Sequence, residues 1–255
     1  MASAPKQHLM TDGLILREYD TLSEADRFVA ILTRDRGVIR ASARGAKRTK
    51  SRFGSSTQPL CYARLSLIPG RDKYVIEDAQ PIEVFFALRQ DVERLALAQY
   101  FCELALRLCP SDADATQHLR LLLGGLHYLA QGEKNPLLIK SVVEGRLLSL
   151  EGYMPDLTGC SLCGQGEPPL WFSPTAGTLS CSAHAGHGDA IEVTAGVLAA
   201  LRHILYGEFE RCFAFALPAA DCAHLATIME RFLLAQTQHR FATLDFYHTL
   251  RTEGI

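Results

Sequence analysis

The first third of the chain consists of short apolar, β-branched runs separated by turn sequences. The runs are LILREY, RFVAILT, VIRASA, CYARLSLI and KYVIEDA, and the turn sequences RDRG and PGRD each separate two of them. Runs of this length are typical of strands, and no helical stretch long enough to intervene lies between them. Five strands in about 70 residues predict a small closed barrel, and a five-stranded oligonucleotide-binding (OB) barrel fits this length.

A helical period replaces the strand pattern from about Val84. The run VFFALRQDVERLALAQYFCELALRLC keeps apolar residues at spacings of three and four until Pro110. ATQHLRLLLGGLHYLAQG and PLLIKSVVEGRLLSLEGY follow, the second with Pro136 at a first helical position. Thr194 is the expected N-cap of TAGVLAALRHILYG, and Asp221 stands near the start of DCAHLATIMERFLLAQTQHR, which we predict to be the last helix. These segments predict a helical bundle.

Together the two patterns predict an α+β protein with two domains. Residues 1–82 are expected to form the OB barrel, and residues 83–255 an all-α helical domain. A cysteine-containing insertion at about residues 157–190 interrupts the helical domain. The sequence contains no internal repeat or low-complexity segment.

The insertion has the spacing of a zinc ribbon. Cys160 and Cys163 form one pair, and Cys181 and His184 form a second pair of the same spacing. Two thiolates on a tight turn can face one ion, and WFSPTAGTLSC between the pairs reads as a hairpin that brings the second pair alongside. Four ligands with no spare position predict one structural zinc per chain. Two alternatives stay open: His187 as the fourth ligand, or unligated cysteines in a loop.

Composition is that of an ordinary globular protein, with 48% hydrophobic and 21% charged residues. The net charge of -2 hides an asymmetry, because residues 1–81 contain 14 Lys and Arg against 9 Asp and Glu, whereas residues 82–255 contain 12 against 19. This split suggests a basic module that binds a polyanion and an acidic module that has a different function. The sequence shows no secretory signal and no membrane span, and its eight cysteines then point to a reducing, cytoplasmic compartment.

The basic charge concentrates in the segment VIRASARGAKRTKSRFG, which follows the third predicted strand and leads to the fourth. Such a run is either a solvated loop or a binding site for an acidic partner. Six cations lie within residues 40–52: Arg40, Arg44, Lys47, Arg48, Lys50 and Arg52. Phe53 and Tyr74 are expected at the barrel core or rim, with base stacking as their alternative role.

Recurrent catalytic motifs are absent from the sequence. It contains no GxxxxGK[ST] phosphate loop, no GxGxxG after a strand, no HExxH and no GxSxG. The histidines of the helical segments are expected to be surface or satisfied side chains. We therefore expect the protein not to be an enzyme.

The barrel, the bundle and the inserted ribbon together resemble the bacterial DNA repair and recombination protein RecO family. The segment SEADRFVAILTRDRGVIRASARGAKRTKSRFGSSTQP is similar to the family's N-terminal signature, and EGYMPDLTGCSLCG is similar to the segment that leads into its first zinc knuckle. The resemblance covers nearly the whole chain, although the last seventy residues match only in helical character. His184 departs from the family pattern, which has a cysteine there.

The resemblance implies a recombination mediator. RecO proteins bind single- and double-stranded DNA, anneal complementary strands, contact the C-terminal tail of single-stranded DNA-binding protein, and act with RecR to load RecA. On this basis we expect a cytoplasmic, nucleoid-associated protein. Lys140 and Arg146, nearly two turns apart on one helix, are the candidates for the tail's terminal carboxylate.

With this resemblance, binding of an acidic partner becomes the preferred interpretation of the basic segment. The candidate DNA-binding residues are the cations of the segment and its neighbours: Arg17, Arg34, Arg36, Arg40, Arg44, Lys47, Arg48, Lys50 and Arg52. An RNA-binding or ribosome-associated adaptor is the alternative from another class. A zinc-dependent nuclease is disfavoured because its metal would need an open coordination position.

Overall fold

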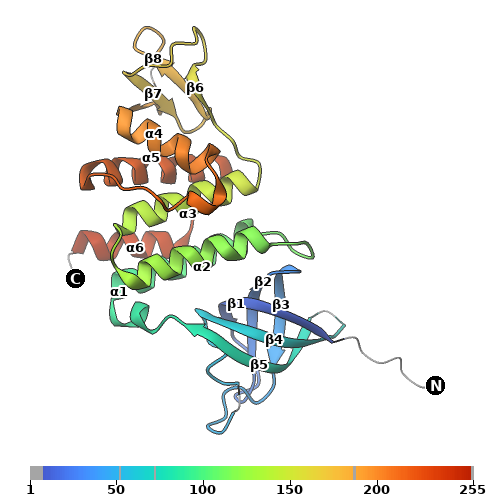
Figure 1. Ribbon diagram of the computed structural model, residues 1–255. Helices are drawn as coiled ribbons and strands as arrows, with labels where there is room; N and C mark the ends of the chain where they lie inside the picture. The colour runs from blue at the N-terminus through green and yellow to red at the C-terminus, as the bar shows by residue number, and fades with distance from the viewer. Residues whose placement is uncertain (1–7, 52, 72, 186–187, 254–255) are drawn as a thin grey trace. The chain divides into compact units, whose positions relative to one another are not determined.

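The computed structural model describes residues 8–51, 53–71, 73–185 and 188–253 (Figure 1). Its N-terminal part is a closed barrel with the strand order β1-β2-β3-β5-β4, in which β4 also pairs with β1. The barrel strands are β1 (Leu9–Tyr19), β2 (Arg27–Thr33), β3 (Gly37–Ala43), β4 (Cys61–Pro69) and β5 (Tyr74–Val84). All five predicted strands are confirmed, although the first begins earlier and the last ends later than the sequence pattern suggests.

Alternation of side chains builds the barrel core. Along β4, the residues Cys61, Ala63, Leu65 and Leu67 are all buried, and the residues between them are partly or fully exposed. Inward-facing residues of the other strands complete this core, as expected for strands with one buried face. The outward face of each strand is thereby left for other contacts.

The helical prediction from Val84 is wrong for its first residues. Val84 still pairs with Cys61 in the sheet, and a short 3-10 helix, η1 (Phe86–Gln90), follows. The long helix α1 (Val92–Leu108) begins only after Asp91, whose side chain accepts a hydrogen bond from the N–H of Arg94 at 3.0 Å. An Asp N-cap satisfies an otherwise unpaired N–H and fixes the start of the helix.

Five more α-helices follow, and two predictions are confirmed at their starts: Pro136 is the first residue of α3, and Thr194 caps α4. Asn135 accepts from the N–H of Leu137 at the start of α3, and Thr194 accepts from the N–H of Val197 at the start of α4. The prediction of a last helix at residues 221–240 is wrong, because α5 ends where Gln238 takes a left-handed conformation and one further helix follows. The helices are α2 (Thr116–Gln131), α3 (Pro136–Leu150), α4 (Ala195–Tyr206), α5 (Ala219–Thr237) and α6 (Ala242–Glu253).

A four-stranded sheet of order β6-β8-β7-β9 lies between α3 and α4 in the chain. The predicted hairpin is confirmed, because β7 and β8 pair antiparallel from Leu170↔Cys181 to Ser173↔Thr178. The strands are β6 (Asp156–Cys160), β7 (Leu170–Ser173), β8 (Thr178–Cys181) and β9 (Ile191–Val193). Two hydrogen bonds from Arg202 of α4 to the carbonyls of Leu157 and Thr158 tie β6 to the helix.

Contacts divide the chain into two compact units. The barrel unit comprises the described residues up to Ala130 and from Thr243 onward, and the central unit comprises Gln131–Ala242. The barrel unit thus includes α1 and most of α2 and α6 in addition to the five strands, and α1 packs on β1 and β2. The sequence boundary at residue 82 falls two residues before the end of β5.

One connection joins the barrel backbone to the helices of its own unit. Gly37 at the β2–β3 turn has a φ of +59°, and a Cβ there would lie 2.0 Å from the carbonyl oxygen of Pro110. The N–H of Val38 donates to that oxygen at 2.8 Å, and the N–H of Ala115 donates to the carbonyl of Arg34 at 2.8 Å. Only glycine fits this close approach without strain.

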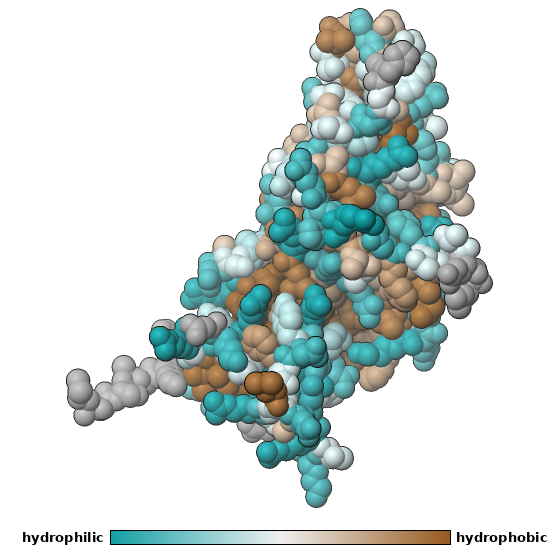
Figure 2. Space-filling view, turned by 180° about the vertical axis from the view of Figure 1, so that it is seen from behind, coloured by the Kyte–Doolittle hydropathy of each residue, from teal (hydrophilic) through white to brown (hydrophobic). Residues whose placement is uncertain are grey.

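The surface mixes polar and apolar residues. On the face drawn in Figure 2, hydrophobic residues gather in several groups among hydrophilic ones. Among the described residues, no helix is both long enough and apolar enough to cross a membrane.

Candidate nucleic-acid interface and metal site

The basic loop, defined here as residues 44–51 and 53–60, has a path fixed by hydrogen bonds and core packing. Its start is fixed by the N–H of Gly45, which donates to the Asp26 carboxylate at 2.7 Å, and by the N–H of Lys47, which donates to the carbonyl of Ala25 at 3.0 Å. Phe53 in its middle is only 7% exposed and belongs to the barrel core. The core role expected for Phe53 is therefore confirmed, and the loop holds its cations in a defined arrangement.

Arg27 fastens the far half of the basic loop to the barrel. Its Nη1 donates to the carbonyl of Gly54 at 2.6 Å and to the hydroxyl of Thr57 at 2.8 Å. The Thr57 hydroxyl donates in turn to the carbonyl of Phe53 at 3.0 Å. Arg27 is 8% exposed and Thr57 fully buried, so this network lies beneath the loop.

Glu18 forms ion pairs with both Arg27 and the candidate DNA-binding residue Lys47. One oxygen of its carboxylate lies 2.8 Å from Nε of Arg27, and the other lies 2.8 Å from Nζ of Lys47. Arg27 is largely buried, whereas the Lys47 side chain is 37% exposed. Lys47 therefore points to solvent with its charge already partly compensated.

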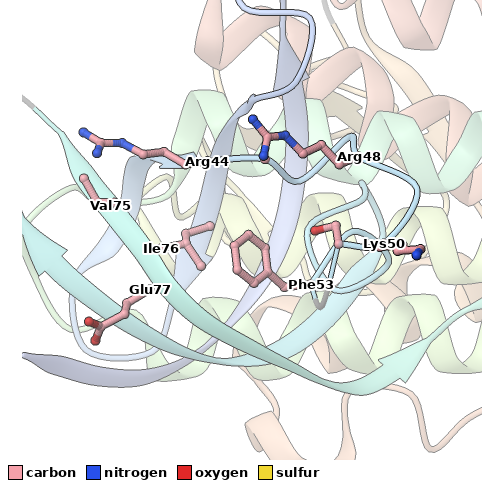
Figure 3. A pocket seen from close by; sticks show the side chains of 9 residues that line it. Arg44, Arg48, Lys50, Phe53, Val75, Ile76 and Glu77 are labelled. Atoms are coloured by element: carbon pink, nitrogen blue, oxygen red, sulfur yellow. The ribbon is translucent and has the colours of Figure 1, made fainter.

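The basic loop and β5 line an open groove of about 580 Å³. Figure 3 shows the ring of Phe53 facing Ile76, with the guanidinium groups of Arg44 and Arg48 to one side of them. Lys50 also lines the groove, and all three cations are exposed. Three of the predicted cations thus line one concave surface with an apolar base.

Asp26 supports the near side of this arrangement. The hydrogen bond from the N–H of Gly45 is the main cause that lowers its pKa from the ordinary aspartate value, and the positive charges of Arg44 and Arg48 act in the same direction. The carboxylate is accordingly ionised at neutral pH. It fixes the turn that presents Arg44.

The remaining predicted cations divide between two places. Arg17 and Arg40 lie over the ring of Tyr19, at 5.5 and 5.6 Å from its centroid. Arg34 and Arg36 lie instead in the β2–β3 turn, at the other end of these strands. Arg34 is paired with Asp35 at 3.1 Å, which raises its pKa.

The structure does not gather all the predicted cations. The β2–β3 turn that carries Arg34 and Arg36 follows Thr33, whereas the basic loop follows Ala43 at the opposite end of β3. Arg52 lies outside the described residues. The geometry therefore brings together five of the named cations, in two adjacent sets: Arg44, Arg48 and Lys50 at the groove, and Arg17 and Arg40 at Tyr19.

Three residues at the second set, Tyr19, Phe28 and Lys73, are not among the residues predicted from the sequence. Tyr19 and Phe28 face each other across β1 and β2, with ring centroids 5.6 Å apart, and both are half-buried. Nζ of Lys73 lies 4.6 Å from the centroid of Phe28. The sequence could have predicted that Phe28 faces outward. Neighbouring side chains of a strand point to opposite faces of the sheet, and the next residue, Val29, is fully buried. The predicted residue Tyr74 is half-buried and packs against the barrel core.

The small sheet brings together the four residues expected to bind metal. The ligand atoms of Cys160, Cys163, Cys181 and His184 all lie within 4.8 Å of one another. The Sγ atoms of Cys163 and Cys181 are 3.7 Å apart, and Nδ1 of His184 lies 3.6 Å from Sγ of Cys160 and 3.3 Å from Sγ of Cys181. This group could hold one metal ion. His187, the alternative ligand, lies outside the described residues.

Two tight turns position these ligands. In the first turn, the N–H of Cys160 donates to the carbonyl of Gln165 and the N–H of Gly164 donates to the carbonyl of Cys160. Gly164 has a φ of +78°, which suits glycine. A backbone hydrogen bond from Leu162 lowers the pKa of Cys160 to about 6, so its thiolate, the form that binds metal, is favoured at neutral pH.

Lys140 and Arg146 do not form the exposed cation pair expected for a partner's tail. Every residue of α3 from Leu138 to Leu148 is buried. Nζ of Lys140 lies 2.8 Å from Glu144 and 2.7 Å from Glu230, and it is 1% exposed. The expectation is corrected on this physical ground, since carboxylates of the chain itself already occupy the ammonium group.

Arg146, like Lys140, is buried and already bonded within the chain. Its Nη2 donates to the carbonyls of Gly207 at 2.5 Å and Glu208 at 3.0 Å, just beyond the end of α4. Arg146 is 6% exposed. Its guanidinium therefore stabilises a helix end, where a cation also complements the helix dipole.

Comparison with known proteins agrees with this architecture. Residues 7–85 match the family model described as "Recombination protein O N terminal", and residues 89–245 match "Recombination protein O C terminal". A protein of Acetivibrio thermocellus named DNA repair protein RecO is 31% identical over 245 residues, which cover 95% of this chain and 97% of the relative. A protein of the same name from Desulforudis audaxviator is 34% identical over 247 residues, covering 96% and 97%. The chain belongs to the RecO family.

Proposed function

We propose that this protein acts in DNA repair and homologous recombination as a mediator that binds single- and double-stranded DNA and anneals complementary strands. Family membership supports the general role, since the relatives are named DNA repair proteins. The groove of the basic loop supports the contact with DNA. Membership of the family is also what supports the further steps, in which the protein acts with RecR, contacts the tail of single-stranded DNA-binding protein and helps to load RecA.

The observation that carries the proposal is the presence of Arg44, Arg48 and Lys50 along one open groove. Cations that neutralise phosphates release condensed counterions, which provides affinity without reading the base sequence. The anchors at Asp26 and Arg27 reduce the conformational entropy that the loop would lose on binding. A phosphate backbone is therefore the best-matched ligand for this surface.

We also propose that the four-residue group at the small sheet holds one structural zinc ion. Tetrahedral zinc bound at about 2.3 Å from sulfur and about 2.0–2.1 Å from nitrogen separates two sulfurs by about 3.8 Å and a sulfur from a nitrogen by about 3.6 Å. The distances of 3.7, 3.6 and 3.3 Å are close to these values. Four protein ligands leave no open position, so the ion would stabilise the fold without taking part in a reaction.

The test of DNA binding is a titration of a labelled single strand with the intact protein at several salt concentrations. If four to six phosphates are neutralised, log affinity should fall against log salt with a slope of about -3 to -4. Replacing Arg44, Lys47, Arg48 and Lys50 together by Ala should flatten the slope by about 2 to 3 units. Parallel titrations with duplex DNA and structured RNA separate DNA binding from the alternative of an RNA adaptor.

A control variant removes the same charge elsewhere in the barrel unit. Four exposed or half-exposed arginines of this unit serve for this: Arg64, Arg94 and Arg251, which pair with nearby carboxylates, and Arg107 of α1. Their replacement by Ala should leave the slope within about 0.5 unit, because they lie outside the groove. Equal losses in the two quadruple variants would contradict the proposed site, and tighter binding of structured RNA than of either DNA would contradict the proposed function.

A further inference from the structure

The outer face of the barrel also carries a pair of half-buried aromatic side chains. Tyr19 of β1 and Phe28 of β2 are opposite one another in the strand register, and their rings are tilted by 42° at a centroid distance of 5.6 Å. Both side chains are half-buried, so part of each ring is open to solvent. Two adjacent, partly exposed rings on a rigid sheet form a platform with fixed geometry.

Cations surround this platform. Arg17 and Arg40 lie over Tyr19, and Lys73 lies over Phe28. All three cations are exposed, so each can leave its ring without uncovering a buried charge. Arg40 also lines, with Lys73, an open concavity of about 540 Å³ on the same side of the barrel. Positive charge beside aromatic rings is complementary to an anionic ligand that also carries flat π-systems.

We propose that Tyr19 and Phe28 form a base-stacking site for unpaired nucleotides and give the protein a preference for single strands over duplexes. This inference rests on the proposed DNA binding and deepens it. The groove of the basic loop binds phosphates of either form, whereas the aromatic pair binds only bases that are free to leave a helix stack. Every base has a π-face, so this preference does not depend on sequence.

The relative strengths of the contacts explain why a base displaces the cations from the rings. An exposed cation–π contact corresponds to about a 2- to 5-fold effect on an equilibrium. Stacking of one base on an aromatic side chain corresponds to about 5- to 150-fold. A guanidinium released from Tyr19 can pair with a neighbouring phosphate. Both new contacts, base on ring and guanidinium on phosphate, therefore favour the exchange.

Duplex DNA cannot make the same exchange. Its bases are already stacked and paired, and taking one out costs unstacking energy. The cations near the rings still attract a duplex backbone, but the rings contribute little. The aromatic pair therefore changes the ratio of the two affinities more than it changes the affinity for a duplex.

The test compares Tyr19→Ala/Phe28→Ala with Tyr62→Ala in the intact protein, using an oligothymidine and a duplex of the same length. Tyr62 is a matched control, since it is a half-buried tyrosine of the same barrel that lies near Asp12. The double variant should bind the oligothymidine about 10- to 100-fold more weakly, with the duplex affinity within about 3-fold of the unaltered protein. Its salt slope should stay within about 0.5 unit, because no charge is removed.

A second measurement does not depend on the stability of the double variant. Phe28→Trp should show tryptophan fluorescence quenched by the oligothymidine and not by the duplex, and the unaltered protein, whose single tryptophan is Trp171, gives the background. Equal quenching by both DNAs, or equal loss of both affinities in the double variant, would overturn the stacking site while the proposed DNA binding stands. Failure of the unaltered protein to bind either DNA would instead overturn the proposed function.

Discussion

Arg27 and Thr57 are hydrogen-bonded, Nη1 to hydroxyl, at 2.8 Å beneath the basic loop. The contact joins the first residue of β2 to the far end of a loop that begins after β3. Since Arg27 also donates to the carbonyl of Gly54 at 2.6 Å, one side chain fixes most of the path of the basic loop. The loop's cations and the sheet therefore keep a constant relation to one another.

Replacing Arg27 by Ala should both destabilise the barrel unit and weaken DNA binding. Removal of the largely buried guanidinium takes the donor from the Gly54 carbonyl and the Thr57 hydroxyl and leaves Glu18 with Lys47 alone, at a cost of about 2 to 4 kcal/mol in the free energy of unfolding. Urea unfolding measures the cost, and limited trypsin digestion reports the release of the loop. Arg64→Ala, which removes an exposed side chain paired with Asp12, should change the free energy of unfolding by no more than about 0.5 kcal/mol. A loop that stays protected from trypsin in Arg27→Ala would show that Phe53 and Asp26 suffice to hold it.

Replacing Glu18 by Gln should strengthen single-strand binding. The change removes the negative charge that pairs with Lys47 of the basic loop and frees Lys47 to contact a phosphate. One additional phosphate contact steepens the salt slope by about 0.7 unit, and we expect about 3- to 10-fold tighter binding at low salt. The control is Glu24→Gln, which neutralises an exposed carboxylate of the β1–β2 connection. Weaker binding in Glu18→Gln would mean that Glu18 acts chiefly by orienting Arg27.

The protein should contain one tightly bound zinc ion per chain when purified without chelator. Elemental analysis of Cys160→Ser should show its loss, and proteolysis should then cut within the small sheet while the barrel unit remains folded, because such ions contribute folding free energy locally. Cys222→Ser, which alters a buried cysteine outside the group, should keep the metal. Zinc retained in His184→Ala and lost in His187→Ala would transfer the fourth ligand to His187, and well under one zinc in the unaltered protein would end the proposal.

Replacing Lys140 by Met should destabilise the central unit strongly. Glu144 and Glu230 would then face each other without the ammonium group between them, at a cost of about 3 to 5 kcal/mol at neutral pH. The triple variant Lys140→Met/Glu144→Leu/Glu230→Leu should recover most of the lost free energy of unfolding, because three apolar side chains replace the three charged ones. Urea unfolding measures this recovery. If Lys140→Met folded normally but lost affinity for the tail of single-stranded DNA-binding protein, the ammonium group would have to be accessible in solution.

Local sequence patterns were sufficient for the elements that depend on neighbouring residues. The five strands followed from alternation between turn residues, and the grouping of Cys160, Cys163, Cys181 and His184 followed from their spacing on two tight turns. The start of α1 was misplaced because the apolar run continues from Val84 across the end of β5. The capping side chain of Asp91 was visible in the sequence but was read as part of the helix.

Contacts between strands could not be read from one sequence. The pairing of Tyr19 with Phe28 depends on the register of β1 and β2, which a linear pattern does not give. The position of Arg27 under the basic loop depends on how that loop turns back over the barrel. The burial of Lys140 was missed for another reason, since a helix buried along its whole middle section carries no polar face to distinguish an internal ion pair from a surface charge.

The close approach of Gly37 to Pro110 has a consequence for amide hydrogen exchange. The N–H groups of Val38 and Ala115 are bonded across the same junction, one in each direction, so neither can reach solvent while the other stays paired. Their exchange should therefore follow a single opening event that lifts the α1–α2 connection from the β2–β3 turn. Protection of these two amides would report the barrel and its first helices as one cooperative body, with no boundary at the end of β5.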